Sequence, residues 1–196
     1  MFTELTNYMG IYRGFADIEN RVFCMDFNPI DTERFPKELI DYAYNREVYY
    51  MKRLNNYNWS PELLDTNDTE RKVYFKWYNN TCEDKLPSNF YNQLLQITKD
   101  LHNEQIYKPS FYQKFFYNDD NDIMRTFSWY TSSNYDEQPL TVDFFKPILN
   151  GDRLQLIENL AVDGKLDMKI LIERGFNDYI KWPGNVLQDI YKEVYA

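Results

Sequence analysis

Apolar side chains recur at intervals of three and four along "FPKELIDYAYNREVYYMKRL", residues 35–54, and this period predicts an amphipathic helix. Pro36 suits the first turn of that helix, where a missing N–H group costs no intrahelical hydrogen bond. The predicted buried stripe is Ile40, Ala43, Glu47, Met51 and Leu54. Glu47 is the exception in this stripe, because it places a carboxylate on an otherwise apolar line.

The same period returns in a second stretch, where Phe90, Leu94, Ile97 and Leu101 predict a helix that ends in "KDLH", residues 99–102. Ser88 precedes this stretch and is expected to cap the helix. The polar segment "NNTCEDKLPS", residues 79–88, is expected to link two lobes. We therefore expect an N-terminal sheet-plus-helix lobe over residues 1–80 and a mostly helical lobe over residues 81–196, packed as one compact unit.

Short apolar and aromatic runs predict strands. "RVFCMDF", residues 21–27, and "RKVYFKWY", residues 71–78, are the clearest, and the alternation in the first puts Cys24 and Asp26 on one face. Two aromatic-rich runs, "FYQKFFY" and "IMRTFSWY", flank the polar turn "NDDND" and predict a hairpin. Its aromatic side chains are expected to be mostly core, with an outward-facing protein-binding patch as the alternative. Residues 141–196 are expected to form helices separated by glycines (Gly151, Gly164 and Gly175).

Composition and charge narrow the possible partners. The chain has 196 residues and a net charge of -9, and its Lys and Arg residues do not cluster, so nucleic acid is not expected to bind. No apolar run reaches membrane-spanning length, so we expect a soluble protein in the cytoplasm of the producing or infected cell, with no membrane contact. Cys24 and Cys82 match no metal or redox spacing and are expected to be reduced thiols. The 18 Tyr, 14 Phe and 6 Gly resemble the usage of an AT-rich genome, as in many bacteriophages.

The order of the predicted elements resembles the protein-kinase-like fold, which includes the small-molecule phosphotransferases. The order is a hairpin, a helix with an inward Glu47, a strand, a linker, a helix ending in "LH", a second hairpin and further helices. In kinases the catalytic loop H-R-D-x-x-x-x-N follows such a helix, and D-F-G follows the hairpin. Laid on residues 101–133 without a gap, Lys108-Pro109-Ser110 falls on H-R-D, Phe115 on the Asn, and Ser128-Trp129-Tyr130 on D-F-G. The resemblance implies an α+β, kinase-like fold.

The signature chemistry is replaced in this register. Phosphoryl transfer needs a carboxylate base and carboxylate and Asn ligands for magnesium, and the matching positions carry Ser110, Ser128 and Phe115. "VFCMD" laid on V-A-I-K puts Asp26 where the phosphate-binding Lys belongs, and the glycine-rich loop is reduced to Gly10 and Gly14. We therefore expect no cofactor, no metal and no nucleotide binding.

The resemblance also implies a cleft between the lobes. It would be lined by Asp26, Glu47, Ser110 and Ser128, with Trp129 filling the D-F-G position. Glu47 would lack its usual lysine, so we expect another cation or hydrogen-bond donor, such as Arg13, Arg21 or Lys76, or water, to satisfy it. We therefore expect Glu47→Gln to be tolerated or mildly stabilising.

Three functional hypotheses follow. The first is a non-catalytic, pseudokinase-like protein that binds another, unidentified protein. The second is a divergent phosphotransferase with relocated residues, for which Asp119, Asp120 and Glu47 are the candidate carboxylates. The third is a structural or assembly protein of a virus particle. The acidic turn at 119–122 fits no calcium-binding loop and is expected to be a solvated turn. His102 lacks companion ligands and is expected to be structural.

Overall fold

The computed structural model describes residues 1–5, 10–109, 111–137, 141–148, 154–155, 158–159, 161–164 and 182–195. These residues form a mixed α/β fold with antiparallel sheets. None of the helices in these ranges is long and apolar enough to cross a membrane.

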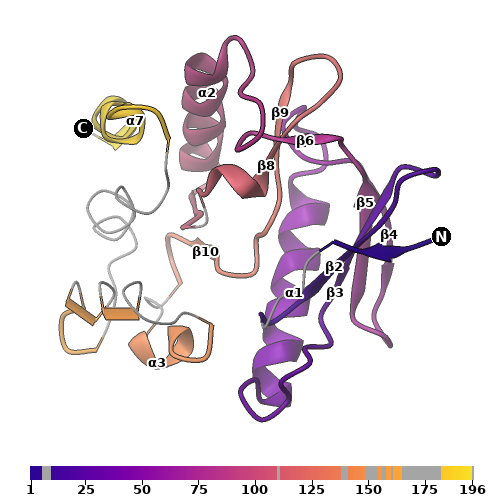
Figure 1. The fold of residues 1–196 in the computed structure, drawn as a ribbon. Helices are drawn as coiled ribbons and strands as arrows, with labels where there is room; N and C mark the ends of the chain where they lie inside the picture. Colours follow the sequence, from indigo (N-terminus) through magenta and orange to yellow (C-terminus); the bar gives the residue numbers. More distant parts are fainter. Residues whose placement is uncertain are drawn as a thin grey trace.

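The N-terminal part is a five-stranded antiparallel sheet (Figure 1). Its strands lie in the order β1-β2-β3-β5-β4, and their bounds are β1 Thr3–Glu4, β2 Arg13–Asp17, β3 Val22–Asp26, β4 Leu63–Asn67 and β5 Lys72–Lys76. The apolar alternation of β3 sets the two faces, because Phe23 and Met25 join the core while Cys24 and Asp26 point to the other face. Both strands predicted in this part are confirmed, and Gly14 lies inside β2 rather than in a loop.

Helix α1, Lys37–Arg53, packs on the apolar face of this sheet (Figure 1). It begins after Pro36 and ends at Leu54, as the sequence predicts. The predicted stripe is buried, and Glu47 within it has no exposed surface. The ring of Phe27 lies 5.9 Å from the ring of Tyr44 of α1, so the end of β3 is joined directly to the helix.

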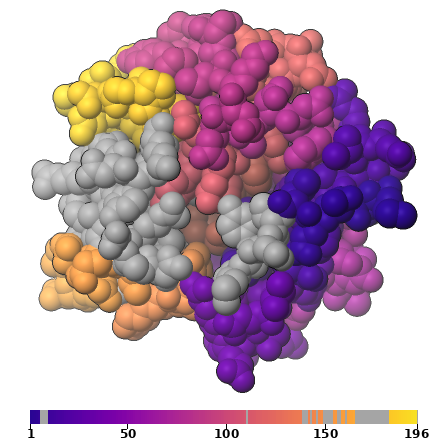
Figure 2. All heavy atoms as spheres, in the orientation of Figure 1, coloured from indigo at the N-terminus to yellow at the C-terminus, as the bar shows by residue number. Residues whose placement is uncertain are grey.

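The second part is built on α2, Phe90–Asn103, and a small three-stranded sheet. This sheet has the order β6-β8-β9, with β6 Asn80–Thr81, β8 Phe116–Asn118 and β9 Met124–Thr126. A two-stranded pair joins β7, Ile106–Tyr107, to β10, Ser133–Asn134. The short helix α3, Val142–Phe145, follows, and α7, Val186–Tyr195, packs beside α2, where Lys99 Nζ lies 2.6 Å from Glu193 Oε1 (Figure 2).

Two local predictions need correction. The hairpin exists, but its strands are three residues each, because Gln113–Phe115 form a 3₁₀ turn, η1, before β8. Ser88 does not cap α2, whose N-cap is Asn89; its hydroxyl and N–H groups instead donate to Asp122 in the hairpin turn. The helical prediction for residues 141–196 holds for α3 and α7, while Gly151 and Gly175 lie outside the described residues.

The core is continuous across the predicted boundary at residues 80 and 81. Phe127, after β9, lies 5.9 Å from Phe23 and 5.4 Å from Phe75, both in the large sheet (ring centroids). Strand β6 spans the boundary itself and pairs with β8. The two parts therefore share one hydrophobic core.

Candidate functional site

Glu47 is buried at the junction between the large sheet and the hairpin. Its Oε1 accepts a hydrogen bond from the N–H of Ser128 at 3.2 Å. Its Oε2 accepts from the N–H of Trp129 at 2.5 Å and from the N–H of Tyr130 at 2.9 Å. One side chain of α1 therefore satisfies three consecutive backbone donors that are more than 80 residues away in the chain.

Lys108 holds the same backbone from its carbonyl side. It follows β7, is 1% exposed, and its Nζ donates to the carbonyl oxygens of Phe127 at 2.8 Å and of Ser128 at 3.0 Å. The ammonium also lies 4.6 Å from the ring centroid of Trp129, in a cation–π contact. We call residues 127–130 the clamped segment, because Glu47 binds its N–H groups and Lys108 its carbonyl groups.

Burial dominates the electrostatics of this pair. It raises the pKa of Glu47 from 4.5 to about 7, against the lowering effect of the three N–H groups and of Lys108. It lowers the pKa of Lys108 from 10.5 to about 7, and the charge of Glu47 opposes that change. Each charge therefore opposes the effect of burial on the pKa of the other group, in a site that is closed to solvent.

The clamped segment has an unusual backbone. Ser128 has a φ of 69°, in the left-handed region that residues other than glycine seldom adopt. This turn aims the N–H groups of three consecutive residues at one carboxylate. It also buries Trp129 completely, with its ring 6.1 Å from those of Tyr50 and Trp59.

Glu47 has the substitute donors that the sequence predicts, but none of the three basic residues named as candidates pairs with it. Arg13 pairs with Asp26 at 3.5 Å, Arg21 with Asp120 at 2.5 Å, and Lys76 with Glu62 at 3.6 Å. The cation whose charge acts on Glu47 is Lys108, which in the sequence is only a lysine between an apolar strand and an aromatic hairpin. Nothing in its local sequence indicates burial, because a buried lysine depends on acceptors that only the tertiary fold provides.

Asp26 does not join Glu47 in one cleft, which corrects the predicted grouping. On β3 it lies on the face opposite to Phe23 and Met25, which pack toward α1. Its Oδ1 accepts from Asn28 Nδ2 at 2.5 Å, and its cross-strand neighbours are Arg13 and Lys72. Asp26 is therefore satisfied on the outer face of the sheet.

The remaining predicted positions have mixed outcomes. Ser128 and Trp129 lie beside Glu47 as predicted, but they contribute backbone N–H groups. Phe115 is a packing residue in η1, and its carbonyl accepts from the N–H of Phe127 at 3.1 Å. Ser110 lies outside the described residues.

Aromatic rings fill the junction between the large sheet and the hairpin. Phe127 is at the centre, and its ring stacks on Tyr117 of β8 with centroids 5.0 Å apart and an interplanar angle of 17°. On the sheet side, Phe23 stacks on Trp77 at 5.8 Å and 12°. The aromatic side chains of the hairpin are buried or half-buried, so they form no exposed patch in the described part of the chain. The alternative of a protein-binding patch on the hairpin is therefore wrong.

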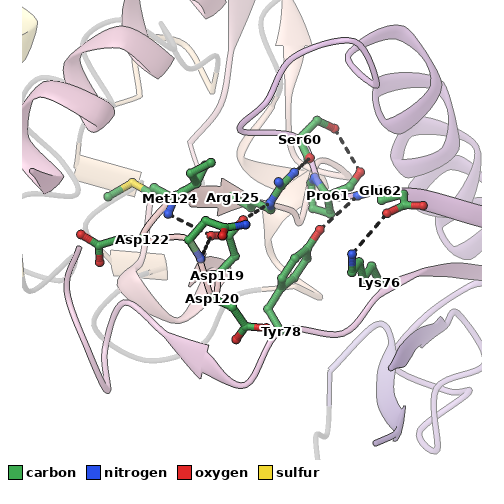
Figure 3. A network of polar contacts seen from close by, with 12 residues as sticks. Ser60, Pro61, Glu62, Lys76, Tyr78, Asp119, Asp120, Asp122, Met124 and Arg125 are labelled. Atoms are coloured by element: carbon green, nitrogen blue, oxygen red, sulfur yellow. Dashed lines mark hydrogen bonds and ion pairs between the residues drawn. The ribbon is translucent and has the colours of Figure 1, made fainter. Parts of the chain in front are cut away.

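The acidic turn is a structural joint rather than the solvated turn that the sequence predicts, because Asp119 is buried in an ion pair. Figure 3 shows Arg125 of β9 between Asp119 and the loop after α1. Its Nε lies 2.8 Å from Asp119 Oδ2, and its NH1 group donates to the carbonyl of Ser60 at 3.0 Å. The pKa of Asp119 is lowered, because Arg125 and two N–H groups of the turn outweigh the effect of burial.

Other candidate groups also have structural partners. Cys24 and Cys82 are free and buried, and burial raises the pKa of each thiol to about 12, so both are unreactive. His102 Nδ1 lies 2.8 Å from the hydroxyl of Tyr135. The described residues contain no group of three or more His, Cys, Asp or Glu side chains that could hold a metal ion.

No protein-family model matches this chain, and no curated protein matches it either.

Proposed function

We propose that this protein is a degenerate, kinase-like protein that works without catalysis by binding another protein. The chain order supports this proposal: β2 and β3, α1 with the inward Glu47, β4 and β5, α2 ending in "LH", then the hairpin and the clamped segment. It is the order that the resemblance to protein kinases implies.

The aromatic filling of the junction is the observation that carries the proposal. A kinase-like protein needs an open cleft between its two parts to hold a nucleotide. Here Phe127 contacts both Phe75 of the sheet and Phe115 of the hairpin side, with ring centroids 5.4 and 5.7 Å away. Opening this junction would expose several aromatic rings, each worth on the order of 2 kcal/mol in burial. The closed junction therefore argues against a nucleotide site.

The charged groups of Glu47 and Lys108 at the junction are already used in hydrogen bonds within the fold. All three hydrogen bonds to Glu47 come from backbone, and Lys108 donates to two backbone carbonyls. Neither side chain is exposed to solvent, where phosphates could reach it. A phosphate-binding lysine must face the ligand, so this arrangement supports a non-catalytic role.

Thermal unfolding in the presence of Mg-ATP tests the proposal that the protein does not bind nucleotide. We expect no change in Tm with ATP, GTP or ADP, with or without magnesium. Saturation at 100 times Kd would add about 2.7 kcal/mol to the free energy of unfolding, which a thermal scan detects easily. A magnesium-dependent rise in Tm would contradict the proposal and favour the divergent phosphotransferase.

The outer face of the large sheet supports the proposal that this protein binds another protein. In the described part of the chain no helix covers this face (Figure 1). The cross-strand pairs Phe15–Cys24 and Cys24–Tyr74 form a row across it, and the ring of Phe2 lies 6.2 Å from that of Tyr74. Phe2 is 46% exposed, and so is Leu64 on β4. Cys24 in the middle of this row is buried and the rings of Phe15 and Tyr74 are half-buried, so Phe2 and Leu64 are the exposed apolar side chains on which a protein interface here would depend.

Cross-linking with surface variants tests this face. We expect Phe2→Ser combined with Leu64→Ser to abolish cross-linking to the partner that the wild type captures. Ile30→Ser is the matched control, since Ile30 is exposed (63%) but lies in the loop between β3 and α1. A partner captured equally by the double variant would contradict the role of this face.

A further inference from the structure

The backbone of the clamped segment has the form of an anion-binding nest. Successive N–H groups around a left-handed residue make a concave site that attracts anions. Ser128 is that residue, with a φ of 69°, and the N–H groups of Ser128, Trp129 and Tyr130 converge on the carboxylate of Glu47. The anion in this nest is therefore a side chain of the protein itself.

The hydrogen bonds to this nest require two acceptor oxygens on one small group. Oε1 of Glu47 accepts from the N–H of Ser128 at 3.2 Å, while Oε2 accepts from Trp129 at 2.5 Å and from Tyr130 at 2.9 Å. An amide would direct its own N–H groups at one of these donors, and a hydroxyl has only one oxygen. An ionised carboxylate presents two acceptors and no donor. The nest therefore selects a carboxylate.

Helix α1 itself gains nothing from a carboxylate at position 47. Glu47 lies in the middle of Lys37–Arg53, away from the first turn, where an acidic side chain would be stabilised by the helix dipole. It is also fully buried on the apolar stripe, where a charge is costly without partners. The contacts with the nest are therefore the reason for a carboxylate at this position.

We propose that the N–H groups of residues 128–130 form a carboxylate-binding site with Glu47 as its built-in ligand, and that a free small carboxylate binds there when this side chain is removed. The site is independent of the proposed protein binding. Glu47→Ala removes one methylene group and the carboxyl group, which together match acetate in size and shape. Glu47→Gly removes one further carbon, so the matching ligand is then propionate.

Urea unfolding of the full chain with added anions tests this site. At slightly alkaline pH, where acetate is ionised, we expect the midpoint for Glu47→Ala to rise with the logarithm of the acetate concentration, because acetate binds the folded state. Acetamide, which has the same shape without the charge, and sodium chloride at equal ionic strength should give no such rise. For Glu47→Gly, propionate should raise the midpoint more than acetate does.

Folding of the variants is a second readout. If Glu47→Ala or Glu47→Gly is unfolded in plain buffer, its matching anion should restore the near-ultraviolet circular dichroism of the wild type. A variant that stays unfolded at every concentration of acetate and propionate would overturn the proposal, because the nest then holds a carboxylate only through its covalent link to α1.

The wild type and Glu38→Ala are the matched controls. Glu38 is an exposed Glu in the first turn of the same helix, and Glu47 fills the nest in both proteins, so acetate should act on them no more than chloride does. Equal effects of acetate on Glu47→Ala and Glu38→Ala would overturn the proposal. Equal effects of acetate and acetamide on Glu47→Ala would do so too, since they would show that the volume is filled without regard to charge.

Discussion

Glu47 and Lys108 are opposite charges that act on the same short stretch of backbone. Burying each charged side chain costs free energy. Five hydrogen bonds with the clamped segment offset this cost, three donated to Glu47 and two donated by Lys108. Removing one member leaves the other as an uncompensated buried charge. The stability of the junction therefore depends on the pair rather than on either residue.

We expect Glu47→Gln to lower the free energy of unfolding by about 3 kcal/mol or more, measured by denaturant unfolding. This reverses the expectation from the sequence that the substitution is tolerated, since Glu47 is fully buried beside Lys108. Glu38→Gln is the control, an exposed Glu in the first turn of the same helix, and should cost less than about 1 kcal/mol. Equal effects of the two substitutions would show that the hydrogen bonds to Glu47 contribute little.

A second prediction concerns pH. The pKa of Glu47 is raised from 4.5 to about 7 in the fold, so the folded chain binds more protons than the unfolded one across that range, and this contribution to stability falls as pH rises. The pKa of Lys108 is lowered from 10.5 to about 7, so its contribution rises with pH above about 7. Together they predict a stability minimum near pH 7 in the difference between the wild type and Glu47→Gln/Lys108→Met. A maximum near pH 7 would mean that the pair stays ionised throughout.

At the scale of elements, Arg125 joins three segments through its side chain. It pairs with Asp119 of the turn, donates to Ser60 after α1, and lies 5.3 Å from the ring centroid of Tyr78 after β5 (Figure 3). Asp119 is 5% exposed in this pair, so its charge depends on Arg125 and on the N–H groups of Asn121 and Ile123. The hairpin is therefore attached to the large sheet by polar contacts as well as by Phe127.

Arg125→Met should lower the free energy of unfolding by about 2 to 3 kcal/mol, because it removes hydrogen bonds to a charged group and leaves Asp119 unpaired. Lys76→Met provides the comparison within the same network. Its ion pair with Glu62 has a longer distance of 3.6 Å and both side chains are exposed, so we expect a loss below about 1 kcal/mol. A small effect of Arg125→Met would show that the aromatic contacts alone hold the hairpin.

The elements differ in how far sequence predicts them. Helix α1 and strand β3 were predictable, because a periodic apolar face decides both. The same alternation put Asp26 and Phe23 on opposite faces of β3, which was already incompatible with Asp26 lying beside an inward Glu47. The bonds of Ser88 to Asp122 and the burial of Lys108 were not predictable, since each depends on a segment distant in sequence. The local hydrophobic pattern determines which face of a helix or strand is buried. Contacts with distant segments determine which polar groups are buried with that face.

At the scale of the whole molecule, the junction between the large sheet and the hairpin is the central feature. Rings from β3, β5, η1 and β8 meet at Phe127, and the clamped segment closes the same junction through Glu47 and Lys108. Apolar packing and the buried charges of Glu47 and Lys108 therefore stabilise the same junction. A closed junction in the resting protein is the basis of the proposed non-catalytic role.

Amide hydrogen exchange with and without Mg-ATP measures this closure directly. We expect the N–H groups of Ser128, Trp129 and Tyr130 to be among the slowest to exchange, because each donates to buried Glu47. Their rates should be the same with and without saturating Mg-ATP. Fast exchange at these three positions in the free protein, or a magnesium-dependent change in their rates on adding ATP, would contradict a closed, non-catalytic junction.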